Sequence, residues 1–240
     1  MSSASSSRRR SPASLVACLA LALLALTGEA RAEAGATAAV PASGYIEWAQ
    51  VAVRSKPDRS AERITVLSSF REDFRPRVVL ALAVRRDAKG RPAWYRISLP
   101  GRPNGRTGWV PAASVDLRPV QREIVIDRSS RTLELRSGRR VLVRTTVAVG
   151  APGMETPLGR FYVVAKFRPT APILGAYAFE TSAYSKLSEW PGGGIVGIHG
   201  TDAPWLLGQA VSHGCVRVAN EEILRLKQLV PVGTPIRIVA

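Results

Sequence analysis

Short apolar runs separated by turn residues occupy the chain from Tyr45 to about Arg118. Within these runs apolar side chains alternate with polar ones or form a brief continuous stretch, and no helical spacing competes with them. Gly, Pro, Asn and Asp are frequent between the runs, as expected of turns. The pattern therefore predicts a small all-β barrel over residues 45–118, with strands near 51–53, 64–67, 77–84, 94–97 and 108–110.

The second half of the chain continues the β pattern and adds one helix. Residues 115–121, which include Pro119, predict a short linker. The strands expected after it are 124–126, 132–135 and 141–143 in a meander, then 145–149, 161–164 and 236–239. A helix is predicted from Asn220, a suitable cap, because apolar residues 223, 226 and 230 share one helical face. The chain is thus expected to be mainly β, with a domain at 121–240 following the barrel.

The N-terminus carries an export pattern. Arg8–Arg10 precede a nearly all-apolar stretch at 13–26, and Ala30–Ala32 forms a small-x-small cleavage site. The stretch is shorter than the roughly 20 residues of a membrane-spanning helix. It predicts a cleaved signal peptide over residues 1–32, secretion to the periplasm or cell wall, and no stable membrane anchor. Lipidation of Cys18 is an alternative, although most of the apolar stretch follows that cysteine. Residues 33–44 predict a flexible tether.

The chain is strongly basic. Its 240 residues carry a net charge of +16, and removal of residues 1–32 leaves 30 basic and 17 acidic residues, a net charge of +13. Such an excess attracts polyanions or simply maintains solubility. No nucleic-acid-binding motif accompanies the charge, so anionic cell-wall polymers are more plausible partners than nucleic acid.

The candidate chemistry lies near one cysteine. After removal of the signal only Cys215 remains, so no intramolecular disulfide can form, and a lone thiol in a secreted chain points to reactivity or an intermolecular bond. The only two histidines, His199 and His213, both lie within 16 residues of it. An imidazole activates a thiol by accepting its proton and lowering its pKa. A zinc site is disfavoured because no second cysteine exists and His213 is only two residues from Cys215. Neither a metal nor a cofactor is expected.

These residues carry a family resemblance. Residues 198–201, Ile-His-Gly-Thr, and 212–217, Ser-His-Gly-Cys-Val-Arg, resemble the L,D-transpeptidase catalytic domain of the YkuD type, a β-rich fold of bacterial cell-wall enzymes. Residues 156–161, Thr-Pro-Leu-Gly-Arg-Phe, match a further motif of that family. Separately, the runs at 53–57, 94–97 and 107–110 resemble the bacterial SH3-like domain, which implies wall or peptide binding at residues 45–118.

The L,D-transpeptidase resemblance implies a catalytic role for five residues. Cys215 is the implied nucleophile and His199 its general base, with the Gly200 carbonyl orienting the imidazole. Backbone N–H groups around His213, Gly214 and Cys215 are the implied oxyanion hole. The His213 side chain is left open between substrate binding, tuning of the thiolate and a structural role.

Substrate contacts are expected from a further set of residues. A lid within 169–190 is expected to exclude water, and its aromatic residues are either walls of the site or ordinary packing. Arg217 is expected to hold a substrate carboxylate or to brace its loop. The candidate substrate-binding residues are Arg217, Ser212, Tyr184 and Trp190.

The resemblance implies an exported enzyme that acts on peptidoglycan stem peptides. Its thioester acyl-enzyme on Cys215 would pass to the amine of a second stem and form a 3→3 cross-link. The alternatives are an L,D-carboxypeptidase, in which water accepts the same acyl group, and a non-catalytic cell-wall-binding protein.

Overall fold

Two large sheets, one two-stranded pair and one α-helix are the main elements of the described part of the chain. The computed structural model describes residues 39–189 and 192–240, so the predicted signal peptide at 1–32 and residues 33–38 of the predicted tether lie outside the described residues. The described residues all belong to one compact unit. Among the described residues, no helix is long and apolar enough to cross a membrane.

The first sheet contains seven strands in the order β3-β2-β6-β5-β4-β1-β7. Its strands are β1 (Ala42–Ile46), β2 (Gln50–Arg54), β3 (Arg63–Ser68), β4 (Val78–Arg86), β5 (Pro92–Ser98), β6 (Thr107–Pro111) and β7 (Val115–Pro119). The strands expected from the sequence all appear as β2 to β6. The strand order ends at β3 and β7, and the SH3-like assignment of this sheet stays a prediction.

Two connections predicted for this region are strands instead. The predicted tether ends early, because residues from Ala42 onward belong to β1. The predicted linker at 115–121 is wrong over its first five residues, which form β7 and pair with β1. Val115 and Leu117 pack against the core of this sheet, while Pro119 lies at the end of an edge strand, where its missing N–H is tolerated.

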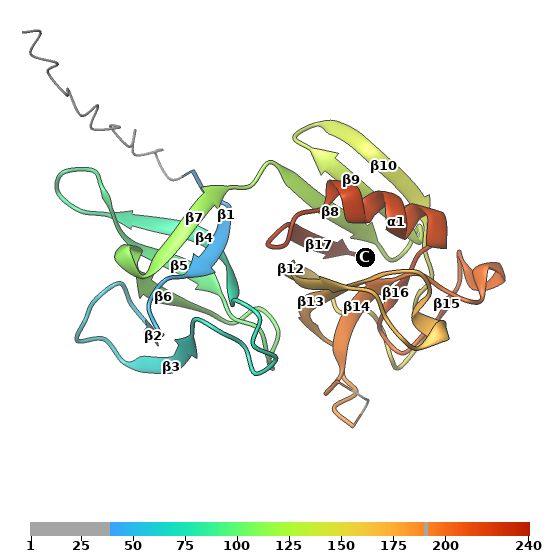
Figure 1. The fold of residues 1–240 in the computed structure, drawn as a ribbon, viewed down its shortest axis with the longest axis horizontal. Coiled ribbons are helices and arrows are strands. Elements are labelled where there is room, and N and C mark those ends of the chain that lie inside the picture. The colour runs from blue at the N-terminus through green and yellow to red at the C-terminus, as the bar shows by residue number, and fades with distance from the viewer. Residues whose placement is uncertain (1–38, 190–191) are drawn as a thin grey trace, which may run out of the picture. The chain divides into compact units, whose positions relative to one another are not determined.

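The second sheet contains eight strands in the order β10-β9-β8-β17-β12-β13-β14-β16, and β11 and β15 form a separate pair (Figure 1). Its strands are β8 (Arg122–Asp127), β9 (Thr132–Ser137), β10 (Arg140–Thr146), β12 (Gly159–Phe167), β13 (Ala178–Tyr184), β14 (Ile195–His199), β16 (Val216–Arg217) and β17 (Pro235–Val239). The separate pair is β11 (Val149–Gly150) and β15 (Ala210–Ser212). The predicted strand at 145–149 is divided, since 145–146 complete β10 and 149 begins β11.

The only α-helix of the described residues, α1 (Asn220–Leu229), packs on this sheet. Its buried residues Ile223 and Leu226 join one core cluster with apolar side chains of β8, β9 and β17, and Figure 1 shows the helix alongside these strands. Glu221 and Glu222 lie in the first turn, where the helix dipole favours negative charge. The predicted cap is wrong: the N-cap position is Ala219, and no side chain caps the helix.

A third buried cluster connects the two sheets. Val78 and Leu80 of β4 pack with Tyr162 and Val164 of β12. The Tyr162 hydroxyl donates a hydrogen bond to the Val78 carbonyl at 3.3 Å. The two sheets therefore share buried contacts, and side chains of the first sheet can influence a site on the second.

Candidate active site

The parallel pairing of β14 with β16 brings Cys215 and His199 together. Ile198 pairs with Val216 and His199 with Arg217, so Cys215 lies opposite Gly197, one residue before the first pair. The Gly197 N–H donates to Cys215 Sγ at 3.3 Å, which is consistent with this register. Because side chains alternate along a strand, Gly197, His199, Cys215 and Arg217 belong to one face.

The opposite face of these strands anchors them in the core. Val196, Ile198 and Val216 are buried with at most 1% of their surface exposed, and all three belong to the main core cluster. The strands are thus fixed by apolar burial on one face, while the other face presents the polar pair. The sequence motifs at 198–201 and 212–217 reflect this division.

Gly197 leaves space between the thiol and the imidazole. A Cβ at this position would lie 3.6 Å from His199 Cδ2 and 3.9 Å from Cys215 Sγ. Both are ordinary van der Waals distances, so the fold does not require glycine here for steric reasons. The absent side chain keeps open the position that touches both reacting groups.

His199 is held as a neutral base. The ring is 3% exposed, and its Nδ1 lies 2.6 Å from the Gly200 carbonyl oxygen. A carbonyl only accepts, so Nδ1 carries the proton and Nε2 has the free lone pair. Burial lowers the His199 pKa to about 4, with a smaller contribution from the positive charge of Arg217. The orienting role predicted for Gly200 corresponds to this geometry.

The thiol of Cys215 is also held in its neutral form. Burial raises the Cys215 pKa above its ordinary value, against the lowering effects of the Gly197 N–H and of Arg217. The sequence-based expectation of a thiol pKa lowered by imidazole differs from this finding. The reason is that His199 is itself neutral and offers no positive charge to stabilise a thiolate.

Ser212 and Thr156 brace the loop that carries Cys215. The Ser212 hydroxyl donates to the Cys215 carbonyl at 2.6 Å and accepts from the Gly214 N–H at 3.1 Å. Thr156, which is completely buried, donates to the Gly214 carbonyl at 2.9 Å and accepts from the Gly150 N–H. Ser212 is 1% exposed and braces this loop, and the substrate contact expected of it stays a prediction.

The backbone of Gly214 has a conformation that favours glycine. Its φ is +113°, and a Cβ there would lie 2.9 Å from Ser185 Cβ. Its N–H already donates to the Ser212 hydroxyl, so in this structure it is not available to an oxyanion. His213, one residue earlier, is exposed.

Arg217 presents an unsatisfied donor on the same face as Cys215. Its Nε is buried and has no hydrogen-bond partner among the described residues. A buried donor without a partner is costly, so the position calls for a ligand that accepts a hydrogen bond. The two roles expected of Arg217, a contact with a substrate carboxylate and a brace for its loop, both stay predictions.

Asn220 connects the segments on either side of the Gly200 carbonyl. Its Oδ1 accepts from the N–H groups of Ala176 at 2.9 Å and Thr201 at 3.2 Å, and its Nδ2 donates to the Thr201 carbonyl at 2.9 Å. A Cβ on Gly200 would lie 2.2 Å from this Oδ1, so the close approach requires glycine. Sequence reasoning treated Asn220 only as a helix cap. The one sequence feature that points to a role in the site is the position of Asn220 shortly after the Cys215 motif.

The predicted lid region is divided between a strand and other structure. Residues 178–184 form β13 inside the sheet, so that part of the lid prediction is wrong. Tyr177 packs against the core and lies edge-on to Phe179, with ring centroids 6.2 Å apart. Tyr184 is half-buried at the end of β13, and Trp190 lies outside the described residues.

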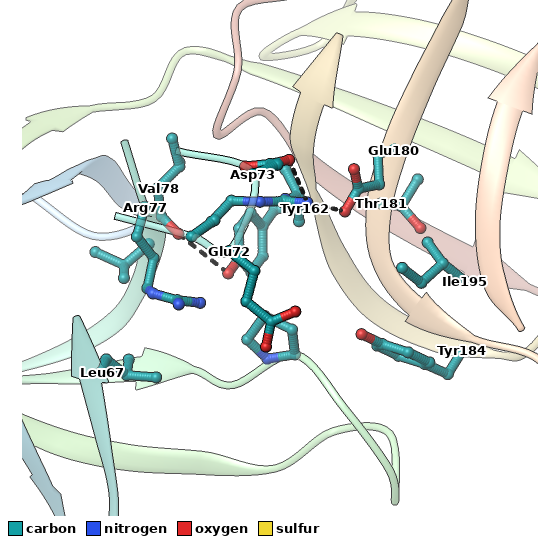
Figure 2. Close-up of a pocket in the computed structure, with 14 residues that line it drawn as sticks. Leu67, Glu72, Asp73, Arg77, Val78, Tyr162, Glu180, Thr181, Tyr184 and Ile195 are labelled. Carbon is teal, nitrogen blue, oxygen red and sulfur yellow. Dashed lines mark hydrogen bonds and ion pairs between the residues drawn. The ribbon is translucent and has the colours of Figure 1, made fainter. Parts of the chain in front are cut away.

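Two cavities lie near the end of β13, and neither is lined by Cys215, His199 or Arg217. The first, about 350 Å³, is lined by residues of both sheets, and an ion pair of 2.7 Å joins Arg71 to Glu180 there. Figure 2 shows Glu180, Tyr184 and Ile195 along one side of it. Glu180 pairs with Gly197 in register, so this cavity continues the face that holds Cys215. The second, about 680 Å³, is lined by Thr156, Tyr184 and Ser185.

Metal-binding side chains do not gather in the described part of the chain. No group of three or more His, Cys, Asp or Glu residues there is placed to hold a metal ion. The site as described therefore consists of a thiol, an imidazole, a guanidinium and backbone amides.

Comparison with known proteins places this site in a family. Residues 121–238 match the family model of the YkuD L,D-transpeptidase catalytic domain. A putative L,D-transpeptidase, YkuD of Bacillus subtilis (strain 168), is 30% identical over 173 residues, which cover 72% of this chain and 92% of that protein. The chain belongs to the YkuD-type L,D-transpeptidase family.

Other similarities to L,D-transpeptidases are shorter or structural. A probable L,D-transpeptidase, YbiS of Escherichia coli (strain K12), is 49% identical over 47 residues, 20% of this chain and 15% of that protein. A solved L,D-transpeptidase from Mycobacterium smegmatis covers 68% of this chain and 91% of its own, at 17% identity and a TM-score of 0.44. The mainly β fold predicted for this L,D-transpeptidase family member is confirmed, with 121–238 as its family-matched segment.

Proposed function

We propose that this chain is an exported cysteine L,D-transpeptidase that cross-links peptidoglycan stem peptides through an acyl-enzyme on Cys215. One observation carries the proposal: β14 and β16 place Cys215 and His199 on one face, on either side of the open position at Gly197. The Gly200 carbonyl fixes the tautomer in which Nε2 accepts a proton. This is the arrangement that a thiol nucleophile and its base require.

Acylation begins from a neutral pair. The Cys215 sulfur attacks the carbonyl carbon of the amide between the third and fourth residues of a stem tetrapeptide. As the S–C bond forms, the thiol proton passes to His199 Nε2. The C–N bond then breaks, and His199 returns the proton to the departing D-alanine amine. A neutral start means that the proton leaves the thiol during attack, since neither group is charged beforehand.

Three groups assist this step. The Cys215 backbone N–H donates to the developing oxyanion, which shifts this role away from Gly214, whose N–H is bound to Ser212. Arg217 Nε donates to no partner among the described residues and is assigned to a carboxylate of the stem peptide. His213 is exposed beside the same loop and contacts the donor peptide.

The acceptor decides the product. Attack on the thioester by the side-chain amine of a second stem's diamino acid gives a 3→3 cross-link and releases the thiol. Attack by water gives a tripeptide and makes the enzyme an L,D-carboxypeptidase. Both outcomes use the same acyl-enzyme, so Cys215 and His199 are required for each.

Incubation of the purified mature protein with tetrapeptide muropeptides tests the proposal. Dimers with loss of D-alanine are expected, whereas tripeptide monomers alone would indicate the carboxypeptidase. Cys215→Ala and His199→Ala are expected to abolish both products, with Ser129→Ala, an exposed turn residue, as the control. Turnover that survives Cys215→Ala would refute the mechanism, and an inert wild-type protein would favour a non-catalytic wall-binding role.

The proposed location is outside the cytoplasm, in the periplasm or cell wall. The support is the sequence pattern at residues 1–32 and the remaining net charge of +13, which suits anionic wall polymers. The first sheet, proposed as an SH3-like domain, supplies the wall or peptide contact. The N-terminal residue of the exported protein tests this directly: Glu33 is expected, and a retained or lipidated Cys18 would contradict signal cleavage after Ala32.

A further inference from the structure

The loop between β5 and β6 reaches the segment that follows β13. This loop belongs to the first sheet and contains Arg102 and Asn104. Their side chains bind backbone groups of Tyr184, Ser185, Leu187 and Gly193, 80 or more positions away in the sequence. Nothing in the mechanism above uses these two residues.

Asn104 forms a paired contact with Tyr184. Its Nδ2 donates to the Tyr184 carbonyl at 2.7 Å, and the Tyr184 N–H donates to its Oδ1 at 3.0 Å. The amide thus satisfies both backbone groups of one residue, as a neighbouring strand would. The contact fixes the end of β13 in position and direction.

Arg102 joins both ends of the same segment. Its guanidinium donates to the carbonyls of Ser185 and Gly193 at 2.9 Å and of Leu187 at 3.3 Å. It also lies 5.0 Å from the centre of the Tyr184 ring. A planar group with five donors can serve several carbonyls at once, which a lysine ammonium with its single nitrogen does less well.

Gly194 allows this approach. A Cβ at that position would lie 2.5 Å from Arg102 Nη2 and 2.0 Å from the Leu187 carbonyl oxygen. Its φ of +74° also favours glycine. The backbone of the segment and the guanidinium therefore fit each other closely.

The segment held in this way lies beside the loop of Cys215. Ser185 is 5% exposed, and its N–H donates to the Gly194 carbonyl at 2.8 Å. Its Cβ lies 2.9 Å from the place where Gly214 would carry a side chain. Arg102, Asn104, Tyr184 and Ser185 all line the cavity of about 680 Å³ next to this loop.

We propose that Arg102 and Asn104 are positioning residues for donor-peptide binding, holding Tyr184 and Ser185 against the Cys215 loop so that the peptide is bound correctly. The inference rests on the proposed function and goes beyond it, because it gives the first sheet a part in substrate binding as well as in wall contact. The residues act through Tyr184 and Ser185 and do not touch the reacting atoms.

Kinetics of the full mature protein test this role. Arg102→Ala and Asn104→Ala are compared with wild type in the release of D-alanine from a tetrapeptide muropeptide over a range of concentrations. In parallel, the alkylation rate of Cys215 by iodoacetamide reports on the thiol itself, because so small a reagent needs no peptide cleft. We expect KM to rise by about 10-fold or more, kcat to change by less than about 3-fold, and alkylation to change by less than about 2-fold.

Matched variants separate geometry from charge and folding. Arg102→Lys keeps the charge but loses the planar guanidinium with its five donors, so it is expected to show most of the rise in KM. Asn104→Asp keeps the acceptor and the size of the side chain but loses the donor, and serves if the alanine variant does not fold. Arg118→Ala, whose side chain is 83% exposed, is the control and is expected to match wild type.

Three results would count against the proposal. Unchanged peptide kinetics in Arg102→Ala and Asn104→Ala, with an active wild type, would overturn the inference and leave the proposed function intact. Equal losses in alkylation and peptide turnover would also overturn it, since they indicate a general structural role. A wild-type protein that releases no D-alanine would instead refute the proposed function and, with it, the inference.

Discussion

At the residue scale, the site depends on what surrounds two neutral groups. Burial holds His199 unprotonated and Cys215 as a thiol, while the Gly200 carbonyl directs the free lone pair of the imidazole to Nε2. Both groups border the open position at Gly197. Reactivity is therefore expected to follow from the geometry of this space and to need no preformed ion pair.

Filling the space at Gly197 is expected to impair chemistry without harming the fold. In Gly197→Ala the new methyl would meet only ordinary van der Waals contacts, yet it would occupy the position next to both Cys215 and His199. We expect acylation by a donor peptide to slow by about 10- to 100-fold. The midpoint of thermal unfolding is expected to stay within about 2 °C of wild type, because no cavity or overlap is created. Unimpaired acylation would show that substrate does not enter this space.

The buried imidazole is expected to make folding stability depend on pH. The folded pKa of His199, about 4, lies below its ordinary value of 6.5, so the unfolded chain takes up a proton that the folded chain does not. Stability is thus present above pH 6.5 and is lost as pH falls towards 4. Between pH 7.5 and pH 5.0 this amounts to about 2 kcal/mol.

Denaturant unfolding at those two pH values measures this effect. Other groups also titrate, so the relevant quantity is the pH-dependent loss in wild type minus that in His199→Gln. His213→Gln, which leaves the buried ring in place, serves as the control and is expected to behave as wild type. An equal loss in wild type and His199→Gln would contradict a buried neutral imidazole.

At the scale of elements, strand pairing and helix placement create the site. The parallel β14–β16 pair sets the register of the two reacting residues, and the first residue of α1, Asn220, ties together the segments at Ala176 and Thr201. These segments flank Gly200, which orients the imidazole. The helix thus contributes to the site through its first side chain as well as through core packing.

Removal of the Asn220 amide is expected to loosen both segments. Asn220→Ala deletes three hydrogen bonds and leaves backbone groups of Ala176 and Thr201 without partners. We expect a loss of about 2–3 kcal/mol in the free energy of unfolding and slower acylation of Cys215. Gln228→Ala, an amide truncation on the exposed face of the same helix, is expected to change stability by less than about 0.5 kcal/mol. Equal stability of the two variants would refute the role of Asn220 in joining the segments at Ala176 and Thr201.

Sequence reasoning found the elements whose signals are local. The strands of β2 to β6 and the helix follow from alternation and helical spacing, and the candidate pair of His199 and Cys215 follows from the motifs around them. It missed β7, because Pro119 reads as a break even at the end of an edge strand. It also assigned Asn220 to the wrong role, because an asparagine that caps a helix and one that joins two distant segments look the same in the sequence.

At the scale of the whole molecule, the two sheets share buried contacts, and residues of both line the two cavities described above. Val78 and Tyr162 join the sheets in the core, while Arg102 and Asn104 bind the segment beside the Cys215 loop. No sequence signal predicts the last two contacts, because they connect residues 80 or more positions apart. Only the fold brings them together, and the inference drawn from them gives the first sheet a part in substrate binding.

Trapping the acyl-enzyme tests the central claim most directly. The mature protein is incubated with a carbapenem, which acylates a reactive active-site thiol, and the adduct is measured by intact mass and located by peptide mapping. We expect one adduct per chain, on Cys215, strongly slowed in His199→Ala and absent in Cys215→Ala. A folded wild-type protein that forms no adduct, or an adduct on another residue, would contradict the account.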